Sequence, residues 1–267
     1  LKSHEILKKS IFKVNDPLQS FANHLNFMFL PMVVQKMEEQ GLIKIHEFLI
    51  ENKQMVCLDG TYSCLDAARL TRWQQLFYGH FEYKEAMELV EISINRTQEE
   101  LELEEEDISA KEINYYRYGM INMKWGEYDK AIDGFIKAID IRSKYSDKDD
   151  EAIQWGVHYK KWLGMTYYLK GDYKKASEYY YKSYTQLSDL IAKSYENKSD
   201  WLELDRSKSI CPHGYLELLL GNHESAKNSI RECRQWLDSN SEQIDDDADA
   251  YQTYRWLYLY YTHLNDK

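Results

Sequence analysis

Apolar residues recur three and four positions apart along most of this chain, which is the spacing of one face of an α-helix. The pattern predicts N-terminal helices at 3–14, 18–40 and 42–52, followed by an extended stretch at 55–60. Beyond it, helices are expected in pairs separated by tight turns. The expected pairs are 62–79 with 82–103, 109–125 with 128–145, 150–170 with 173–195 and 205–220 with 223–239, and a last helix follows at 247–264. The expected fold class is all-α.

The turns inside these pairs share one short sequence pattern that ends in alanine. The alanines lie 45, 45 and 50 residues apart, at Ala86, Ala131, Ala176 and Ala226. Seven positions before the turn stands a small or polar residue, which is Gln74, Gly119, Gly164 or Gly214. Four positions after the alanine stands a large apolar residue, which is Val90, Phe135, Tyr180 or Ile230. A repeat of this period predicts stacked helical hairpins, whose main use is to present a surface.

The middle of the chain resembles the tetratricopeptide repeat family. The residues that carry the resemblance are Leu163-Gly164-x-x-Tyr167, Gly171-x-Tyr173-x-x-Ala176, Tyr180 and Ser183, and Gly119, Gly126, Tyr128, Ala131, Phe135 and Ala138 repeat them one unit earlier. The family's usual period is about 34 residues. Here the repeats are elongated to 45–50 residues, and no proline ends the second helix twelve residues past the alanine. The first repeat has neither the glycine of the small position nor the turn glycine. In the fourth repeat, His223 replaces the turn tyrosine.

The resemblance covers about residues 66–240 and implies a right-handed superhelical solenoid of antiparallel helical hairpins. We expect an N-terminal helical segment at residues 1–60 and a solenoid at 61–267. The solenoid would hold about four hairpins and a C-terminal capping helix, because the exposed end of such a stack needs a cover. Elongated repeats of this kind also resemble those of Rap-type peptide-sensing regulators and of helical-repeat immunity proteins of bacterial toxin systems.

Composition narrows the classes of partner. The net charge of −11 and the pI near 5.3 argue against nucleic-acid binding, which needs a basic stripe along the phosphates. The most apolar run, at 25–34, is too short to span a membrane, which takes about 20 residues. The four cysteines show no metal-site spacing, and Cys233 occupies a small packing position, which predicts a buried thiol. We therefore expect a reduced, cytoplasmic setting.

Motifs that carry chemistry are mostly absent from the sequence. There is no zinc-protease motif, nucleophile elbow, phosphate-binding glycine loop or EF-hand, so we expect no enzyme activity, no cofactor and no metal. The alternative from another class is an enzyme whose site lies in the N-terminal segment. Its clustered candidates would be His46, Glu47, Asp59 and Asp66, and their spacing indicates no particular reaction.

Two candidate binding surfaces remain. The first helix of each hairpin should line a concave groove, and the residues counted from the small position are Tyr116, Met120, Met123, Lys161, Met165, Tyr168 and Tyr215. Methionine and tyrosine make adaptable contacts with peptides, although packing against neighbouring helices is the other interpretation. The links between hairpins should form an acidic edge that contains Glu104, Glu105, Glu106, Asp149, Asp150 and Asp246. Such an edge would attract a basic partner or simply keep the protein soluble.

The function expected from the sequence is a protein–protein interaction module that binds a protein or peptide, and the acidic edge would suit a basic partner. In one version it is an immunity protein that neutralises a toxin through the acidic edge or the groove. In the other it is a Rap-like regulator whose groove takes a short peptide and whose N-terminal helices respond. The oligomeric state and the identity of the partner stay open at this point.

Overall fold

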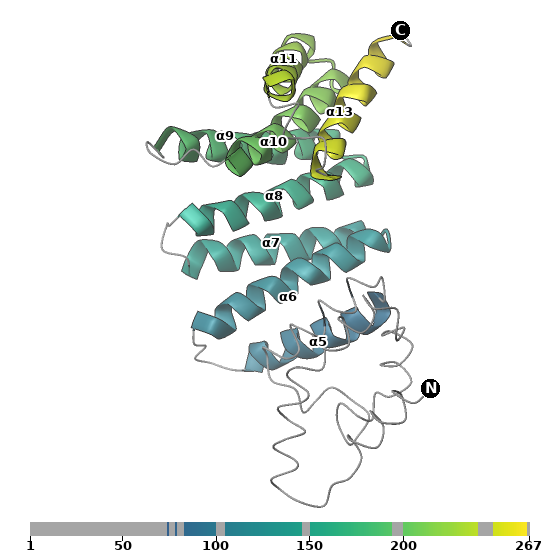
Figure 1. Ribbon diagram of the computed structural model, residues 1–267. Coiled ribbons are helices and arrows are strands. Elements are labelled where there is room, and N and C mark those ends of the chain that lie inside the picture. The colour runs from purple at the N-terminus through teal and green to yellow at the C-terminus, as the bar shows by residue number, and fades with distance from the viewer. Residues whose placement is uncertain are drawn as a thin grey trace, which may run out of the picture. The chain divides into compact units, whose positions relative to one another are not determined.

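The computed structural model describes residues 74, 78, 83–99, 105–145, 150–193, 200–239 and 248–265 (Figure 1). The chain divides into two compact units, residues 1–103 and 104–267. Every regular element in the described ranges is an α-helix, which confirms the all-α fold class. The helices expected at 3–14, 18–40 and 42–52 and the extended stretch at 55–60 lie outside the described residues, as does most of the helix expected at 62–79.

In the first unit, α5 (Tyr83–Glu99) corresponds to the second helix of the first expected hairpin. It buries an apolar face that includes Ala86, Leu89 and Val90. Gln74 is fully buried, and its Nε2 donates a hydrogen bond to the Leu89 carbonyl at 3.2 Å. At the small position, where the later repeats have a glycine, the first repeat therefore has the polar side chain of Gln74, which bonds to α5.

In its described residues, the second unit is a stack of three antiparallel hairpins with one further helix (Figure 1). Its helices are α6 (Glu105–Lys124), α7 (Tyr128–Tyr145), α8 (Asp150–Lys170), α9 (Tyr173–Lys193), α10 (Asp200–Leu219), α11 (His223–Ser239) and α13 (Ala248–Asn265). The hairpins are α6 with α7, α8 with α9, and α10 with α11. Between hairpins, α7 packs on α8 and α9 on α10, while α13 packs on α10. These bounds lie close to those that the hydrophobic pattern predicts.

Each hairpin turns at a glycine in the left-handed conformation. Gly126, Gly171 and Gly221 have φ angles of 79°, 87° and 82°. In the first of these turns, the Glu127 N–H donates to the Asn122 carbonyl at 2.9 Å, and the other two turns repeat this bond. This geometry satisfies the last carbonyls of the first helix, and a residue with a Cβ adopts it only under strain. The turn glycines therefore fix where each first helix ends.

The two helices of each hairpin approach closely at the small position. A Cβ added to Gly119 would lie 2.8 Å from the Phe135 ring, and one added to Gly214 would lie 2.8 Å from Ile230. Gly164 makes the same contact with Tyr180 at 3.0 Å. Each large apolar residue of the repeat thus packs against the glycine of its own hairpin. Tyr180 is consequently held in a fixed place between α8 and the helices beyond it.

A buried ionic cluster joins three helices of the stack. Glu112 of α6 is 2% exposed, and it accepts a hydrogen bond from Arg142 Nε of α7 at 2.9 Å. The hydroxyl of Tyr159, on α8, donates to the same carboxylate. Burial raises the pKa of Glu112, while the bond from Tyr159 and the charge of Arg142 act in the opposite direction. The cluster fixes the position of α8, which carries four residues of the site described below.

The prediction of a buried thiol at Cys233 is wrong. Cys233 is fully buried in its small packing position, but it forms a disulfide with Cys211, whose Cα lies 5.3 Å from its own. The two cysteines lie on the facing helices α10 and α11, a closeness that their separation in sequence does not reveal. Free cysteines are absent from the described part of the chain, and Cys57 and Cys64 lie outside it. The cysteines therefore no longer support a reduced, cytoplasmic setting, which stays a prediction.

Candidate functional site

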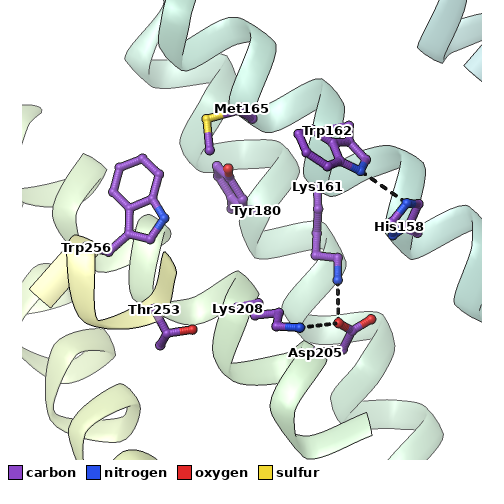
Figure 2. A pocket seen from close by; sticks show the side chains of 9 residues that line it. All are labelled: His158, Lys161, Trp162, Met165, Tyr180, Asp205, Lys208, Thr253 and Trp256. Carbon is purple, nitrogen blue, oxygen red and sulfur yellow. Dashed lines mark hydrogen bonds and ion pairs between the residues drawn. The ribbon is translucent and has the colours of Figure 1, made fainter. Parts of the chain in front are cut away.

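A pocket of about 120 Å³ opens between α8, α10 and α13, with Tyr180 of α9 at its back (Figure 2). Its apolar walls are Trp162, Met165, Tyr180 and Trp256, and its polar lining is His158, Lys161, Asp205, Lys208 and Thr253. Three of its four helices are the first helices of successive repeat units. The pocket therefore lies on the face where the repeat pattern places the groove.

The register of α8 explains why one helix supplies four of these side chains. His158, Lys161, Trp162 and Met165 are spaced at i, i+3, i+4 and i+7, so they project from one face. Gly164 lies next to Met165 and is the point where α8 packs closely against Tyr180, which itself lines the pocket. The close approach at this glycine thus brings Tyr180 beside the pocket face of α8.

Three charged side chains meet at one side of the pocket (Figure 2). Lys161 Nζ of α8 lies 2.6 Å from Asp205 Oδ1 of α10, and Lys208 Nζ lies 3.9 Å from the same oxygen. The side chains of Lys161, Asp205 and Lys208 are 14%, 20% and 17% exposed, so water screens these charges only in part. The described part of the lining thus holds two ammonium groups and one carboxylate, and both lysines also interact with other groups.

Thr253 of α13 adds a hydroxyl to the same pocket (Figure 2). The residue is 1% exposed, and its Oγ1 has no hydrogen-bond partner among the residues that the structure describes. A buried polar group without a partner costs about 1–3 kcal/mol of stability. Such a group at the surface of a pocket is a group that a ligand could satisfy.

His158 holds Trp162 in place through its ring nitrogen. The indole N–H of Trp162 donates to His158 Nε2 at 3.1 Å, and the Tyr116 hydroxyl lies 3.1 Å from the same nitrogen. Because the indole can only donate, Nε2 must accept, and the neutral ring carries its proton on Nδ1. Tyr116 packs on the rings of His158 and Tyr159 at centroid distances of 5.4 and 5.2 Å. The contact with His158, which Tyr116 supports in turn, therefore fixes the orientation of Trp162 in the pocket wall.

The opposite wall, Trp256, is supported by tyrosines from three helices. Its ring centroid lies 5.0 Å from that of Tyr168, 5.8 Å from that of Tyr215 and 6.2 Å from that of Tyr180. Burial raises the pKa of each of these three tyrosines, so their hydroxyls stay protonated near neutral pH. The wall is an uncharged aromatic cluster.

The predicted groove residues have different surroundings in the structure. Lys161 and Met165 line the pocket, while Tyr168 and Tyr215 support its wall. Tyr116 packs behind His158. The remaining two, Met120 and Met123, are 5% and 7% exposed and lie in the core. A direct contact of any of these seven residues with a partner stays a prediction.

The acidic edge is only partly within the described ranges. Glu104, Asp149 and Asp246 lie outside them. Glu105 and Glu106 fall in the first turn of α6, and Asp150 is the first residue of α8. Figure 1 shows that α6 and α8 begin on the same side of the second unit. The edge as a binding surface also stays a prediction.

The sequence did not predict seven of the lining residues as site residues, namely His158, Trp162, Tyr180, Asp205, Lys208, Thr253 and Trp256. The predicted groove positions begin three residues before the small position, whereas Lys208 and Thr253 lie six and five residues before Gly214 and Tyr258. Helical side chains, however, lean toward the N-terminus of their helix, so the preceding turn also contributes. One signal was present, because Trp162 and Trp256 occupy the same place in their repeats, two positions before Gly164 and Tyr258.

A second polar cluster, between α9 and α10, has the composition of a catalytic triad but another arrangement. The Ser177 hydroxyl donates to Glu217 Oε1 at 2.6 Å and lies 2.8 Å from His213 Nδ1. Since the hydroxyl proton goes to the carboxylate, the serine oxygen accepts from the imidazole, and His213 does not act as its base. Ser177 is also 3% exposed. The cluster therefore connects two helices.

The described ranges contain no group of three or more His, Cys, Asp or Glu side chains placed to hold a metal ion. Their helices are also too short or too polar for any of them to cross a membrane. The residues of the alternative enzyme site, His46, Glu47, Asp59 and Asp66, lie outside the part of the chain that the structure describes.

Comparison with known proteins agrees with this architecture. The sequence model of the tetratricopeptide repeat family matches residues 114–145 and 162–186. The nearly identical TPR-like repeats of a kinesin-light-chain-type protein from Podosopora anserina superpose with a TM-score of 0.57 at 12% identity, over 88% of this chain and 100% of that one. The apo form of RapI superposes with a TM-score of 0.59 at 14% identity, over 86% of this chain and 81% of that one.

At these identities the structural likeness is a likeness of fold. No curated protein matches the chain. The family match falls on the two units whose glycines and turn tyrosines carry the repeat pattern, and the superpositions extend the same architecture over most of the chain. The chain therefore has the fold of tetratricopeptide-like repeat proteins, with elongated repeats, and two of its repeats match the sequence model of that family.

Proposed function

We propose that this protein binds a peptide segment of a partner protein on the face formed by α8, α10 and α13, with the pocket as the anchor point. The observation that carries the proposal is the lining of the pocket. Four apolar side chains surround a partly buried group of charges and an unsatisfied hydroxyl. Ligand sites typically combine mostly apolar walls with a few placed polar groups that fix orientation.

The chemistry of the pocket favours binding over catalysis. Asp205 is engaged by Lys161 and Lys208, and His158 accepts a hydrogen bond from Trp162. These contacts use the titratable groups of the pocket to position helices and rings. Among the described lining residues, none is a nucleophile held against a free base, which acyl or phosphoryl transfer would need. Repeat folds of this type generally serve as scaffolds for recognition.

Between the two versions drawn from the sequence, the pocket supports the one in which the groove takes a peptide. The likeness in fold to RapI agrees with the sequence resemblance to Rap-type peptide-sensing regulators. The toxin-neutralising version depends more on the acidic edge, and half of the residues named for that edge lie outside the described ranges. It therefore stays a prediction from the sequence.

The test is partner capture from the native lysate with three forms of the purified protein. Met165→Glu places a charge on the apolar wall of the pocket. Ile136→Glu places the same charge on α7, which contributes no described residue to the pocket, at a position that is 43% exposed. We expect a protein or peptide to be recovered by the unaltered form and by Ile136→Glu, and to be lost with Met165→Glu.

Circular dichroism of all three forms controls for folding. The proposal fails if the same partner is recovered equally by all three at both low and high salt. Binding that depends on salt but not on Met165 would instead support the acidic edge, because interactions between exposed charges weaken as ionic strength rises.

A further inference from the structure

We infer that the bound segment is an amphipathic α-helix of about four turns, which lies along the exposed face of α8. The inference rests on the proposed function and adds the conformation of the ligand and the length of its contact. One apolar side chain of this helix would enter the pocket. The remaining contacts would continue along α8 past both ends of the pocket.

The first observation is a row of aromatic and apolar side chains on α8 that is longer than the pocket. We call it the α8 stripe, and its members are Trp155, His158, Trp162, Met165 and Leu169. Trp155 and Leu169, which lie outside the pocket, are 39% and 44% exposed, and the three residues between them are partly exposed. From residue 155 to residue 169 the helix rises by about 21 Å. The stripe contains no acidic residue, lysine or arginine.

The second observation is that the neighbouring hairpins do without such a stripe. The residues of α6 at the same distances from Gly119 are Ala110, Ile113, Arg117, Met120 and Lys124. The residues of α10 at the same distances from Gly214 are Asp205, Lys208, Pro212, Tyr215 and Leu219. Each of these two sets contains two charged residues. The stacking of the described hairpins therefore does not require uncharged residues at these positions, and α8 differs for another reason.

The third observation is the spacing of the stripe, which alternates between three and four residues. Residues at this spacing form the seam along which one helix packs against another. Successive members of such a seam rise by about 5.3 Å on average. In an extended segment, side chains on one face recur every 6.6 Å or so. An extended ligand would thus fall out of step with the stripe within a few contacts, whereas a helix stays in step over its whole length.

The fourth observation is that polar side chains in and beside the stripe are already engaged. His158 Nε2 accepts a hydrogen bond from Trp162, Lys161 lies 2.6 Å from Asp205, and Lys161 and Lys208 have further interactions (Figure 2). An extended segment needs partners for its own N–H and C=O groups, which a helix satisfies internally. A helical ligand therefore suits a surface whose polar groups are occupied.

The exposed end of the stripe at Trp155 is held in place before any ligand binds. Its ring centroid lies 5.8 Å from that of His158 and 6.0 Å from that of Tyr159. An aromatic side chain that is already ordered loses little conformational freedom on binding. Trp155 thus extends the contact surface of the pocket with a second fixed indole, on the same face as Trp162.

The experiment is selection of a library of random peptides of about 16 residues, long enough for four turns, on the full-length protein. Enriched peptides are synthesised, and their dissociation constants are measured by fluorescence anisotropy. We expect apolar residues to recur at intervals of three and four in the enriched sequences. The circular-dichroism signal of helix should increase when peptide and protein are mixed.

Two changes to an enriched peptide test its conformation. A lactam bridge between a glutamate and a lysine four positions apart, on the polar side of the peptide, should strengthen binding by about tenfold relative to the unbridged peptide, because less freedom is left to lose. Proline at a central polar position should weaken binding by about a hundredfold, since it interrupts a helix. Alanine at the same position is the control and should change little.

Variants of the protein test the length of the contact. Trp155→Glu and Leu169→Glu each place a charge at one end of the stripe, outside the pocket. Each should weaken the peptide by about tenfold or more, because the helix would bury that charge against apolar side chains. Ile136→Glu, at a position of α7 that is 43% exposed, should change nothing. Urea denaturation of all forms controls for folding.

The outcomes separate this inference from the proposed function. A peptide that needs Met165 but binds Trp155→Glu and Leu169→Glu as well as the unaltered protein, or that stops binding when the bridge is closed, would overturn the inference and leave the proposed function standing. A dimer of the protein alone that Trp155→Glu dissociates, seen by sedimentation velocity, would also overturn it, because a second copy would cover the stripe. If no enriched peptide depends on Met165, both the proposed function and the inference fail.

Discussion

The small position of the repeat is buried in the complete hairpins of the second unit but exposed in its last helix, α13. Aligning residues 254–258 with 115–119 places Tyr258 where the hairpins have Gly119, Gly164 and Gly214. Those glycines are buried beneath a large side chain of the following helix, whereas Tyr258 is 69% exposed. A glycine at this position receives a second helix at close distance, and a tyrosine cannot receive one in that way.

The difference shows that α13 is held from one side. Trp256 and Tyr260 pack into the core with α10, while Tyr254, Tyr258 and Tyr261 are exposed at a spacing of i, i+4 and i+7. A terminal helix of this kind covers the apolar end of the repeat stack. Yet Thr253 and Trp256 of this same helix line the pocket. A ligand bound there would stabilise the docking of α13, since binding to the folded form alone shifts the equilibrium toward it.

The largest effect is expected where two helices of a hairpin are closest. A Cβ added to Gly134 of α7 would lie 2.8 Å from the Gly119 nitrogen and 2.9 Å from the Tyr115 carbonyl oxygen. Both atoms belong to the backbone of α6 and cannot move aside as a side chain would. Gly134→Ala should therefore force α6 and α7 apart and lower the free energy of unfolding by about 1–3 kcal/mol, measured by urea denaturation.

Gly156→Ala is the matched control for this change. Gly156 lies inside α8, and a Cβ there would meet nothing within 4 Å. Replacing a glycine inside a helix by alanine stabilises it by about 0.5–1 kcal/mol when space allows. The two substitutions should thus act with opposite signs. Equal stabilisation by both would show that the close crossing of α6 and α7 does not exist in solution.

The repeat units could be predicted from the sequence because their determinants are local. The turn glycines fix where the first helix ends, and the period of the apolar residues fixes the helices. The glycine of one helix and the large residue of the next fix where the two helices meet. The pocket could not be predicted in the same way. Asp205 and Thr253 belong to helices far apart in sequence, and only the stacking of α10 and α13 brings them together. The Cys211–Cys233 bond likewise depends on how α10 and α11 face each other.

An intermediate effect is expected from His213, which lies one position before Gly214 and contacts Ser177 of the neighbouring hairpin. Burial lowers the pKa of His213 below its ordinary value of 6.5, and the charge of Glu217 opposes this only in part. The folded protein then binds fewer protons than the unfolded chain. This contribution to stability is fully present above pH 6.5 and is lost as the pH falls through the lowered pKa of the folded state.

The loss can reach about 1.4 kcal/mol per pH unit for one proton. This loss of stability is measured by thermal and urea denaturation of the unaltered protein and of His213→Gln between about pH 7.5 and about pH 5. We expect the variant to depend less on pH across this range. His223→Gln, at an exposed position in the first turn of α11, should keep the full dependence. If His213→Gln keeps it as well, other groups cause the acid sensitivity of this stack.

The smallest effect is expected at the end of the stack. If Tyr258 faces water, Tyr258→Ala removes little packing, and the helix propensity of alanine offsets part of that loss, so the free energy of unfolding should change by less than about 0.5 kcal/mol. Urea denaturation at two protein concentrations checks this. A loss of about 2 kcal/mol or more at the higher concentration would mean that this face is covered by a second copy, because stability gained through association grows with concentration. A large loss that does not depend on concentration would mean that another part of the same chain covers it. Either result would remove the contrast between α13 and the hairpins, and with it the conclusion that this helix is held from one side.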